Sequence, residues 1–154
     1  MASVAAGDLS AAYGQQSAMP RTVGFLVAGT PASHGAWVAA FTQRLSEFGW
    51  TDGRNVKIEY RWAAGDIPQT RKFATEFVQK KVDVIVTSAF GVEAASEATS
   101  TIPIVSAAFG DVVAKGLAKS LARPGGNVTG LSIEPVELSS KRRSFRMFAI
   151  SRHW

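Results

Sequence analysis

A short run of β-branched residues at positions 82–86 (VDVIV) constrains the fold of this chain more than any other feature. Such a run suits a strand that is covered on both faces, as in a parallel sheet. A turn of small residues follows at 87–91, and the next stretch, 92–99, has the alanines and early acids of a helix. The run is therefore the best candidate for the central strand of an α/β sheet.

The same succession of strand and helix patterns repeats along the chain. Ser33 is expected to cap a first helix that Gly49 ends, and Asp66 is expected to cap a second helix with Pro68 in its first turn. A shorter helix is predicted at 113–121. Predicted strands cover residues 22–28, 55–62, 82–86, 103–108 and 127–133. This order predicts a doubly wound parallel five-stranded sheet with helices on both faces.

Composition excludes several classes of function. The 154 residues are 46% hydrophobic, enough for one sizeable core, and they contain no cysteine, which excludes disulfides and thiolate chemistry. The net charge of +5 comes from the C-terminal end, because the other 12 basic residues balance the 12 acidic ones. We therefore expect no nucleic-acid partner, and no apolar run is long enough to predict a membrane span. The five C-terminal basic residues are Lys141, Arg142, Arg143, Arg146 and Arg152.

Candidate binding residues gather on the turns that follow the predicted strands. In open α/β sheets ligands bind at the carboxyl ends of the strands, and a helix N-terminus favours an anion. Three candidates also have a structural interpretation: Ser88 and Asp111 as helix caps, and His34 as a solvated or capping residue. The candidate set is Thr30, Ser33, His34, Ser88, Phe90, Gly91, Phe109 and Asp111.

The same residues argue against catalysis. Small hydroxyls and aromatic rings at one rim, with no set of nucleophile and base, describe binding better than turnover. Only His34 and His153 are available as histidines, so no metal site is predicted. The glycine patterns that cradle a dinucleotide or a nucleoside triphosphate are both absent. We therefore expect neither an enzyme nor a bound cofactor.

Four motifs give the chain a close resemblance to a known family. They are G-W-x-D-G-x-N-V at 49–56, D-V-I-V-T-S at 83–88, T-I-P-I-V at 101–105 and S-L-A-R-P-G-G-N-V-T-G at 120–130. In this order and spacing they resemble the ABC transporter substrate-binding proteins, in the family that includes tryptophan- and tyrosine-type solute receptors. The resemblance covers about 21–138. It implies two similar lobes of the type I periplasmic-binding fold, each with strand order 2-1-3-4-5, that close on a small solute.

The resemblance also implies roles for individual residues. If the solute is an amino acid or a similar anion, Ser88 and the N–H groups of Phe90 and Gly91 face its carboxylate. Thr30 adds a second hydroxyl and Phe109 an apolar wall. The implied partners are the small solute and an ABC permease, and the implied location is periplasmic or otherwise extracytoplasmic.

The expected organisation is a single lobe at 21–138 between two short segments. Residues 1–20 are expected to be a disordered leader remnant. Their second half, 11–20, resembles the mature end of the family's export leader, but the basic start and apolar middle are missing, so the export signal is incomplete. Residues 139–154 form an atypical basic tail, expected to be frayed or at most weakly helical, where family members continue into a second lobe. A truncated lobe is expected to bind its solute far more weakly than a complete receptor, and its exposed surface permits a homodimer.

Two other interpretations remain open from sequence. A single-domain flavodoxin-like or receiver-like module has the same sheet order, although a receiver needs acids after the first and third strands, where Gly29-Thr30 and Thr87-Ser88 stand. A flavin would give the protein a yellow colour. An α/β enzyme is the third possibility, and a panel of substrates would test it.

Overall fold

The structure, a computed structural model, describes residues 20–109, 126–134 and 144–148. All five predicted strands are present, and three of the predicted helices lie between the first four. The helix predicted at 113–121 and the segment 1–19 lie outside the described residues. The elements are β1 (Arg21–Val27), α1 (Pro31–Glu47), β2 (Val56–Trp62), α2 (Ile67–Gln79), β3 (Val84–Thr87), α3 (Phe90–Ala98), β4 (Ile104–Phe109), β5 (Val128–Glu134) and β6 (Ser144–Phe148).

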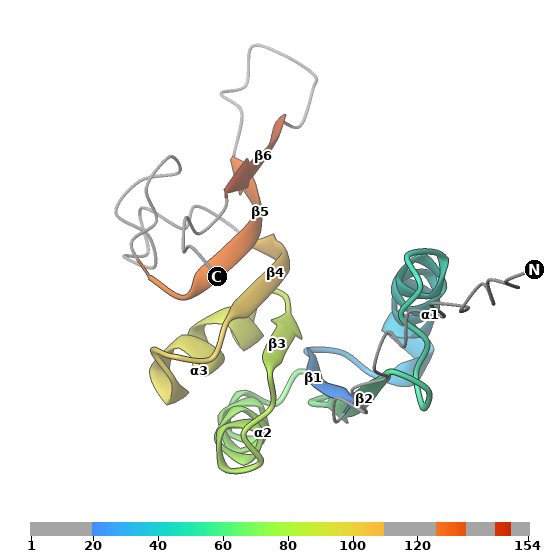
Figure 1. Ribbon diagram of the computed structural model, residues 1–154. Helices are drawn as coiled ribbons and strands as arrows, with labels where there is room; N and C mark the ends of the chain where they lie inside the picture. Colours follow the sequence, from blue (N-terminus) through green and yellow to red (C-terminus); the bar gives the residue numbers. More distant parts are fainter. Residues whose placement is uncertain (1–19, 110–125, 135–143, 149–154) are drawn as a thin grey trace, which may run out of the picture.

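The strands form one sheet in the order β2-β1-β3-β4-β5-β6. Strands β1 to β5 run parallel, which confirms the predicted five-stranded sheet and its order. Figure 1 shows α1 on one face of the sheet and α2 and α3 on the other. This is the doubly wound arrangement that the alternating pattern predicts.

The prediction of a frayed C-terminal tail is wrong for residues 144–148. They form β6, which pairs antiparallel with β5 in the register Ile133↔Phe145. An unpaired strand edge exposes a row of backbone donors and acceptors, and β6 provides partners for those of β5. Five residues are too few to show a strand period among arginines, so the sequence gives no signal for this element.

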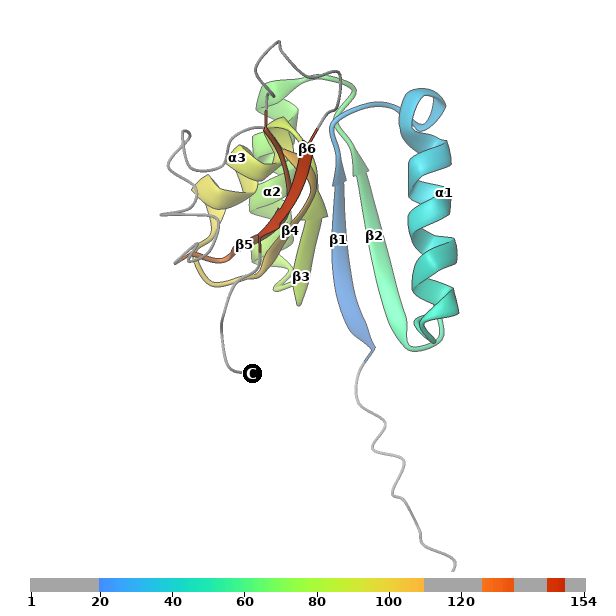
Figure 2. The same ribbon diagram turned by 90° about the horizontal axis from the view of Figure 1, so that it is seen from above.

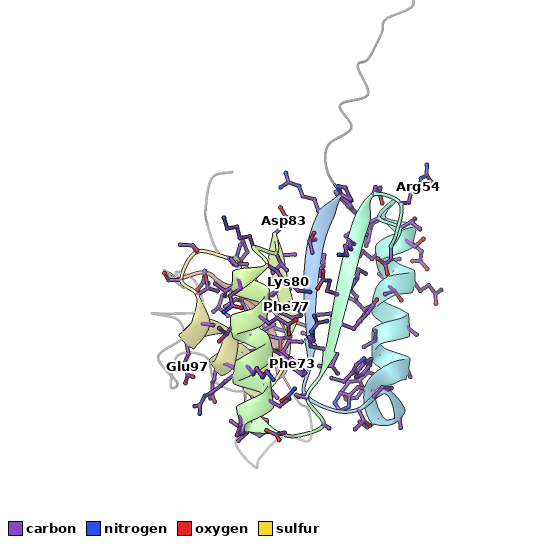
Figure 3. All side chains as sticks on the ribbon, turned by 90° about the horizontal axis from the view of Figure 1, so that it is seen from below. Arg54, Phe73, Phe77, Lys80, Asp83 and Glu97 are labelled. Carbon is purple, nitrogen blue, oxygen red and sulfur yellow. The ribbon has the colours of Figure 1, made fainter. Side chains whose placement is uncertain are left out.

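The main core lies between the sheet and the two helices α2 and α3. Phe77 of α2 is fully buried against Leu26, Ile85 and other apolar residues. Gly24 of β1 makes room for it, because a Cβ there would lie 2.7 Å from a ring carbon of Phe77. Figure 3 shows Phe77 and Phe73 on α2, with Phe73 nearer the end of the sheet where β1 finishes.

The opposite face of the sheet has a smaller core under α1. Phe41 and Leu45 pack on apolar residues of β1 and β2, and the rings of Phe41 and Phe25 meet edge to face at 4.9 Å. No residue of α1 is fully buried. Trp37 of α1 and Phe48, the C-cap of this helix, are each 68% exposed.

A group of charged side chains joins edge strand β2 to α2. Glu59 binds Lys57 at 2.9 Å and also Lys80, while Arg61 binds Glu76 at 2.6 Å. These contacts, chiefly the hydrogen bonds from Lys80 and Lys57, lower the pKa of Glu59 from 4.5 to about 2. The charges that alternate along β2 in the sequence therefore fix this edge strand to its neighbouring helix.

We expect Gly24→Ala to destabilise the protein by about 1–3 kcal/mol, because the added methyl group overpacks the ring of Phe77. Gly35→Ala is the matched control: no atom lies within 4 Å of its Cβ position, and α1 should gain about 0.5–1 kcal/mol. Urea unfolding of both variants measures the two changes. Equal effects of the two substitutions would show that Phe77 does not need the space at Gly24.

Stability should fall as the pH drops from about 4.5 to about 2, and Glu59 should carry part of this loss. Its pKa is lower in the folded protein than in the unfolded chain, so its contribution is complete above 4.5 and disappears as the carboxylate is protonated. Glu59→Gln should lower the free energy of unfolding at pH 6 and reduce its pH dependence. The measurement is the urea midpoint at several pH values, and parallel curves for the two proteins would refute this role.

Candidate functional site

The candidate site lies where β1 and β3 end side by side. These strands are parallel neighbours in the register Leu26↔Thr87, so the segments that follow them leave the same edge of the sheet. The chain then continues from β1 to α1 on one face and from β3 to α3 on the other. Figure 2 shows β1 and β2 ending at this edge, beside the start of α1. Crevices in open α/β sheets form at such a switch point.

The N-terminus of α1 is closed by its own side chains. Thr30 is the N-cap and accepts a hydrogen bond from the Ser33 N–H at 3.2 Å, while the Thr30 N–H donates to Ser33 Oγ at 3.0 Å. The prediction that Ser33 is the N-cap is therefore wrong, since Ser33 is the third helical residue. Proline is favoured at the first helical position, so Pro31 was the sequence signal that identifies Thr30 as the N-cap.

His34 lies in the first turn of α1 rather than in a loop. Its Nδ1 is 2.8 Å from Ser33 Oγ, and its ring meets the Trp37 ring at a centroid distance of 4.7 Å. The imidazole also lies against Gly29, where a Cβ would collide with it. Within the described residues the His34 ring therefore has packing partners and one side-chain hydrogen bond.

The N-terminus of α3 lacks a side-chain cap. Its N-cap is Ala89, with φ 47° and ψ −127°, and no side-chain cap hydrogen bond forms there. The Gly91 N–H donates to the Ser88 carbonyl at 3.0 Å, which with the positive φ of Ala89 describes a turn of type II′. The interpretation of Ser88 as a helix cap is therefore wrong. Among the described residues, the Ser88 hydroxyl has no hydrogen-bond partner.

Gly91 has a packing role that the sequence did not reveal. A Cβ at this position would collide with Thr87 Oγ1, so only glycine lets α3 start this close to β3. The Thr87 hydroxyl, which is buried, donates to the Leu26 carbonyl at 2.9 Å. Gly91 and Thr87 thus hold α3 against the two central strands and keep Ser88 at the edge.

Three large apolar side chains are exposed near the starts of the three helices at this edge. Trp37 of α1 is 68% exposed, Ile67 of α2 is 45% exposed and Phe90 of α3 is 53% exposed. Sequence reasoning identified only Phe90 of these three as a site residue. Phe109 is the last residue of β4, which ends two strands from β1, and Asp111 lies outside the described residues.

The described residues do not provide the ligand set of a metal site. No group of three or more His, Cys, Asp or Glu side chains comes together in 20–109, 126–134 and 144–148. In the same residues no helix has the length and apolar character needed to cross a bilayer. The edge instead offers a free hydroxyl at Ser88, an uncapped helix start and three exposed apolar side chains, which suits a small ligand with one anionic end.

Comparisons with known proteins point to one family. The profile of a family described as ABC transporter substrate binding protein matches residues 29–142. Over 93 residues the chain is 44% identical to the tyrosine-binding protein of Clostridioides difficile (strain R20291), which covers 60% of this chain and 27% of that protein.

Two solved structures extend the comparison. A ligand-free, open substrate-binding protein with adhesive properties from Clostridium difficile has a TM-score of 0.70 and 33% identity, covering 76% of this chain and 40% of that one. A Streptococcus pneumoniae ABC domain in complex with L-Trp has a TM-score of 0.67 and 29% identity, covering 73% and 38%. The chain thus spans from about a quarter to two fifths of the length of these relatives.

We expect Ala89→Gly to stabilise the protein by about 0.5–1 kcal/mol. Glycine relieves the strain of the positive φ, about 1–3 kcal/mol, and loses part of this gain to the greater freedom of the unfolded chain. Ala94→Gly, inside α3, is the control and should cost about 1 kcal/mol. Thermal unfolding measures both variants, and a loss of stability in Ala89→Gly would argue against the turn.

Proposed function

The chain belongs to the ABC transporter substrate-binding protein family, and we propose that residues 21–138 form one lobe of a site for an amino acid or a similar small anion. Proteins of this family bind substrates and are not enzymes. In the proposed role the complete receptor works outside the cytoplasm and delivers its solute to the permease of an importer. The edge described above is the side of the lobe that faces the solute.

The contrast between the two helix starts carries this proposal. At α1 the Ser33 N–H donates to the Thr30 side chain and Pro31 has no N–H, whereas α3 has no side-chain cap. Gly91 and Val92 of α3 donate to backbone carbonyls, which leaves the Phe90 N–H without a partner among the described residues. The N-terminal end of a helix bears a partial positive charge and unpaired N–H donors, which favour an anion. The solute carboxylate is therefore assigned to α3, with the Ser88 hydroxyl as a further donor.

This assignment changes two of the roles that the resemblance implies. The Gly91 N–H already donates to the Ser88 carbonyl, so the Phe90 N–H and the Ser88 hydroxyl are the proposed donors to the carboxylate. The side-chain oxygen of Thr30, Oγ1, accepts a hydrogen bond from the Ser33 N–H and lies 3.1 Å from Ser33 Oγ. Thr30 is therefore proposed to shape the rim, and Ser88 to bind.

The relatives indicate which solutes to test first. One similar protein is named for tyrosine binding, and one similar structure holds L-Trp. An aromatic amino acid combines the carboxylate that suits α3 with a ring that suits exposed apolar side chains such as Phe90. We propose L-tyrosine and L-tryptophan as the first candidates.

Ser88→Ala should weaken binding of L-tyrosine or L-tryptophan by at least about tenfold, because a hydrogen bond to a charged group is lost. Amide chemical shifts of the 15N-labelled full chain, titrated with the unlabelled amino acid, measure the affinity. Ser46→Ala is the matched control, since Ser46 is an exposed serine near the far end of α1. Sedimentation at the same concentration checks for self-association through the exposed edge.

Two outcomes of this titration would refute the proposal. One is the absence of shift changes at residues 88–91 with either amino acid. The other is equal affinity of the wild type and Ser88→Ala, which would place the carboxylate elsewhere.

A further inference from the structure

Trp37 is a large apolar side chain that the folded chain leaves uncovered. Its exposed fraction of 68% equals that of Phe48, near the other end of the same helix. Both lie on the apolar stripe of α1 with Phe41 and Leu45, which pack on the sheet. The sheet therefore covers only the middle of the stripe. Its uncovered N-terminal end, at Trp37, lies beside the candidate site.

The indole of Trp37 is held at this end by a series of contacts. Side chains on a helix point back toward its N-terminus, which brings the indole over the first turn of α1. The His34 ring meets it at a centroid distance of 4.7 Å and an interplanar angle of 74°. Ser33 Oγ, part of the capping box with Thr30, holds His34 Nδ1 at 2.8 Å. The contacts fix an exposed aromatic surface beside the end of β1.

We propose that Trp37 contacts the side chain of the solute and is a specificity-determining residue of the site. The inference rests on the proposed function, which assigns the solute carboxylate to α3. The chain leaves β1 for α1 and β3 for α3 at the same edge of the sheet, so the start of α1 borders the place to which the carboxylate is assigned, and the other end of the solute is proposed to lie toward α1. Trp37 is the most exposed apolar side chain on that side of the edge. Aromatic surfaces favour a planar ring over an aliphatic side chain of similar size.

The indole N–H signals of the tryptophans provide a direct test in the intact chain. Trp37→Phe identifies the signal of Trp37, and Trp50, which follows the C-terminal end of α1 and is 44% exposed, serves as an internal control. Addition of unlabelled L-tyrosine should shift the Trp37 signal in parallel with the Ser88 amide. The Trp50 signal should stay in place.

A pair of substitutions tests specificity. Trp37→Leu should weaken binding of L-tyrosine by about threefold to tenfold and leave binding of L-isoleucine within about twofold, because only an aromatic contact is lost. Phe48→Leu, at an equally exposed position of the same helix, should change neither affinity.

The outcomes separate this inference from the proposed function. If L-tyrosine shifts the Ser88 amide while the Trp37 indole stays in place, the inference is wrong and the proposed function stands. If neither signal moves, both are wrong. If Trp37→Leu does not fold, the indole shift in the wild-type chain still decides the question. A Trp37 shift that appears only with protein concentration, without solute, would assign the residue to contacts between copies and overturn the inference.

Discussion

The parallel pairing of β1 with β3 determines the rest of this structure. At the start of the pair, the Thr22 N–H donates to Asp83 Oδ2 at 2.7 Å and the Asp83 N–H donates to the Thr22 carbonyl at 2.9 Å. At its end, the Thr87 hydroxyl donates to the Leu26 carbonyl. Bonds at both ends fix the register, and a slip of one residue would turn the buried side chains toward the wrong face. Because the two strands are parallel neighbours, the segments after β1 and β3 leave the sheet at the same edge.

The two helices that start at this edge begin differently. At α1 the side chains of Thr30 and Ser33 form a capping box, and the contact of Ser33 Oγ with His34 Nδ1 also fixes the position of His34. For α3 the backbone turn at Ala89 replaces a side-chain cap, and Gly91 allows the helix to begin directly on Thr87. This strained turn makes no use of the Ser88 hydroxyl, which has no hydrogen-bond partner among the described residues. A polar group of this kind is suited to an external ligand.

The sequence predicted the sheet because each parallel strand is a buried run followed by a helix pattern of ordinary length. It failed where local signals are short or ambiguous. The five residues of β6 show no period, and their pairing depends on the edge of β5. The turn at Ala89 has no glycine at the position of positive φ, so the usual signal is missing. The exposure of Trp37 depends on how far the sheet extends beneath α1, which no local pattern indicates.

Residues that depart from the best local choice gather at the candidate edge. Ala89 has a positive φ at the N-cap of α3, α3 begins without a side-chain cap, and Trp37 is 68% exposed with its ring against that of His34. Two similar residues at the opposite end of the sheet have local explanations. Lys81 takes the left-handed conformation that is common after a helix. The exposed ring of Phe48 is in contact with the Arg44 guanidinium, which lies 4.6 Å from the ring centroid. A folded chain retains unfavourable choices mainly where function needs them. Their concentration where β1 and β3 end therefore supports a ligand site there independently of the family.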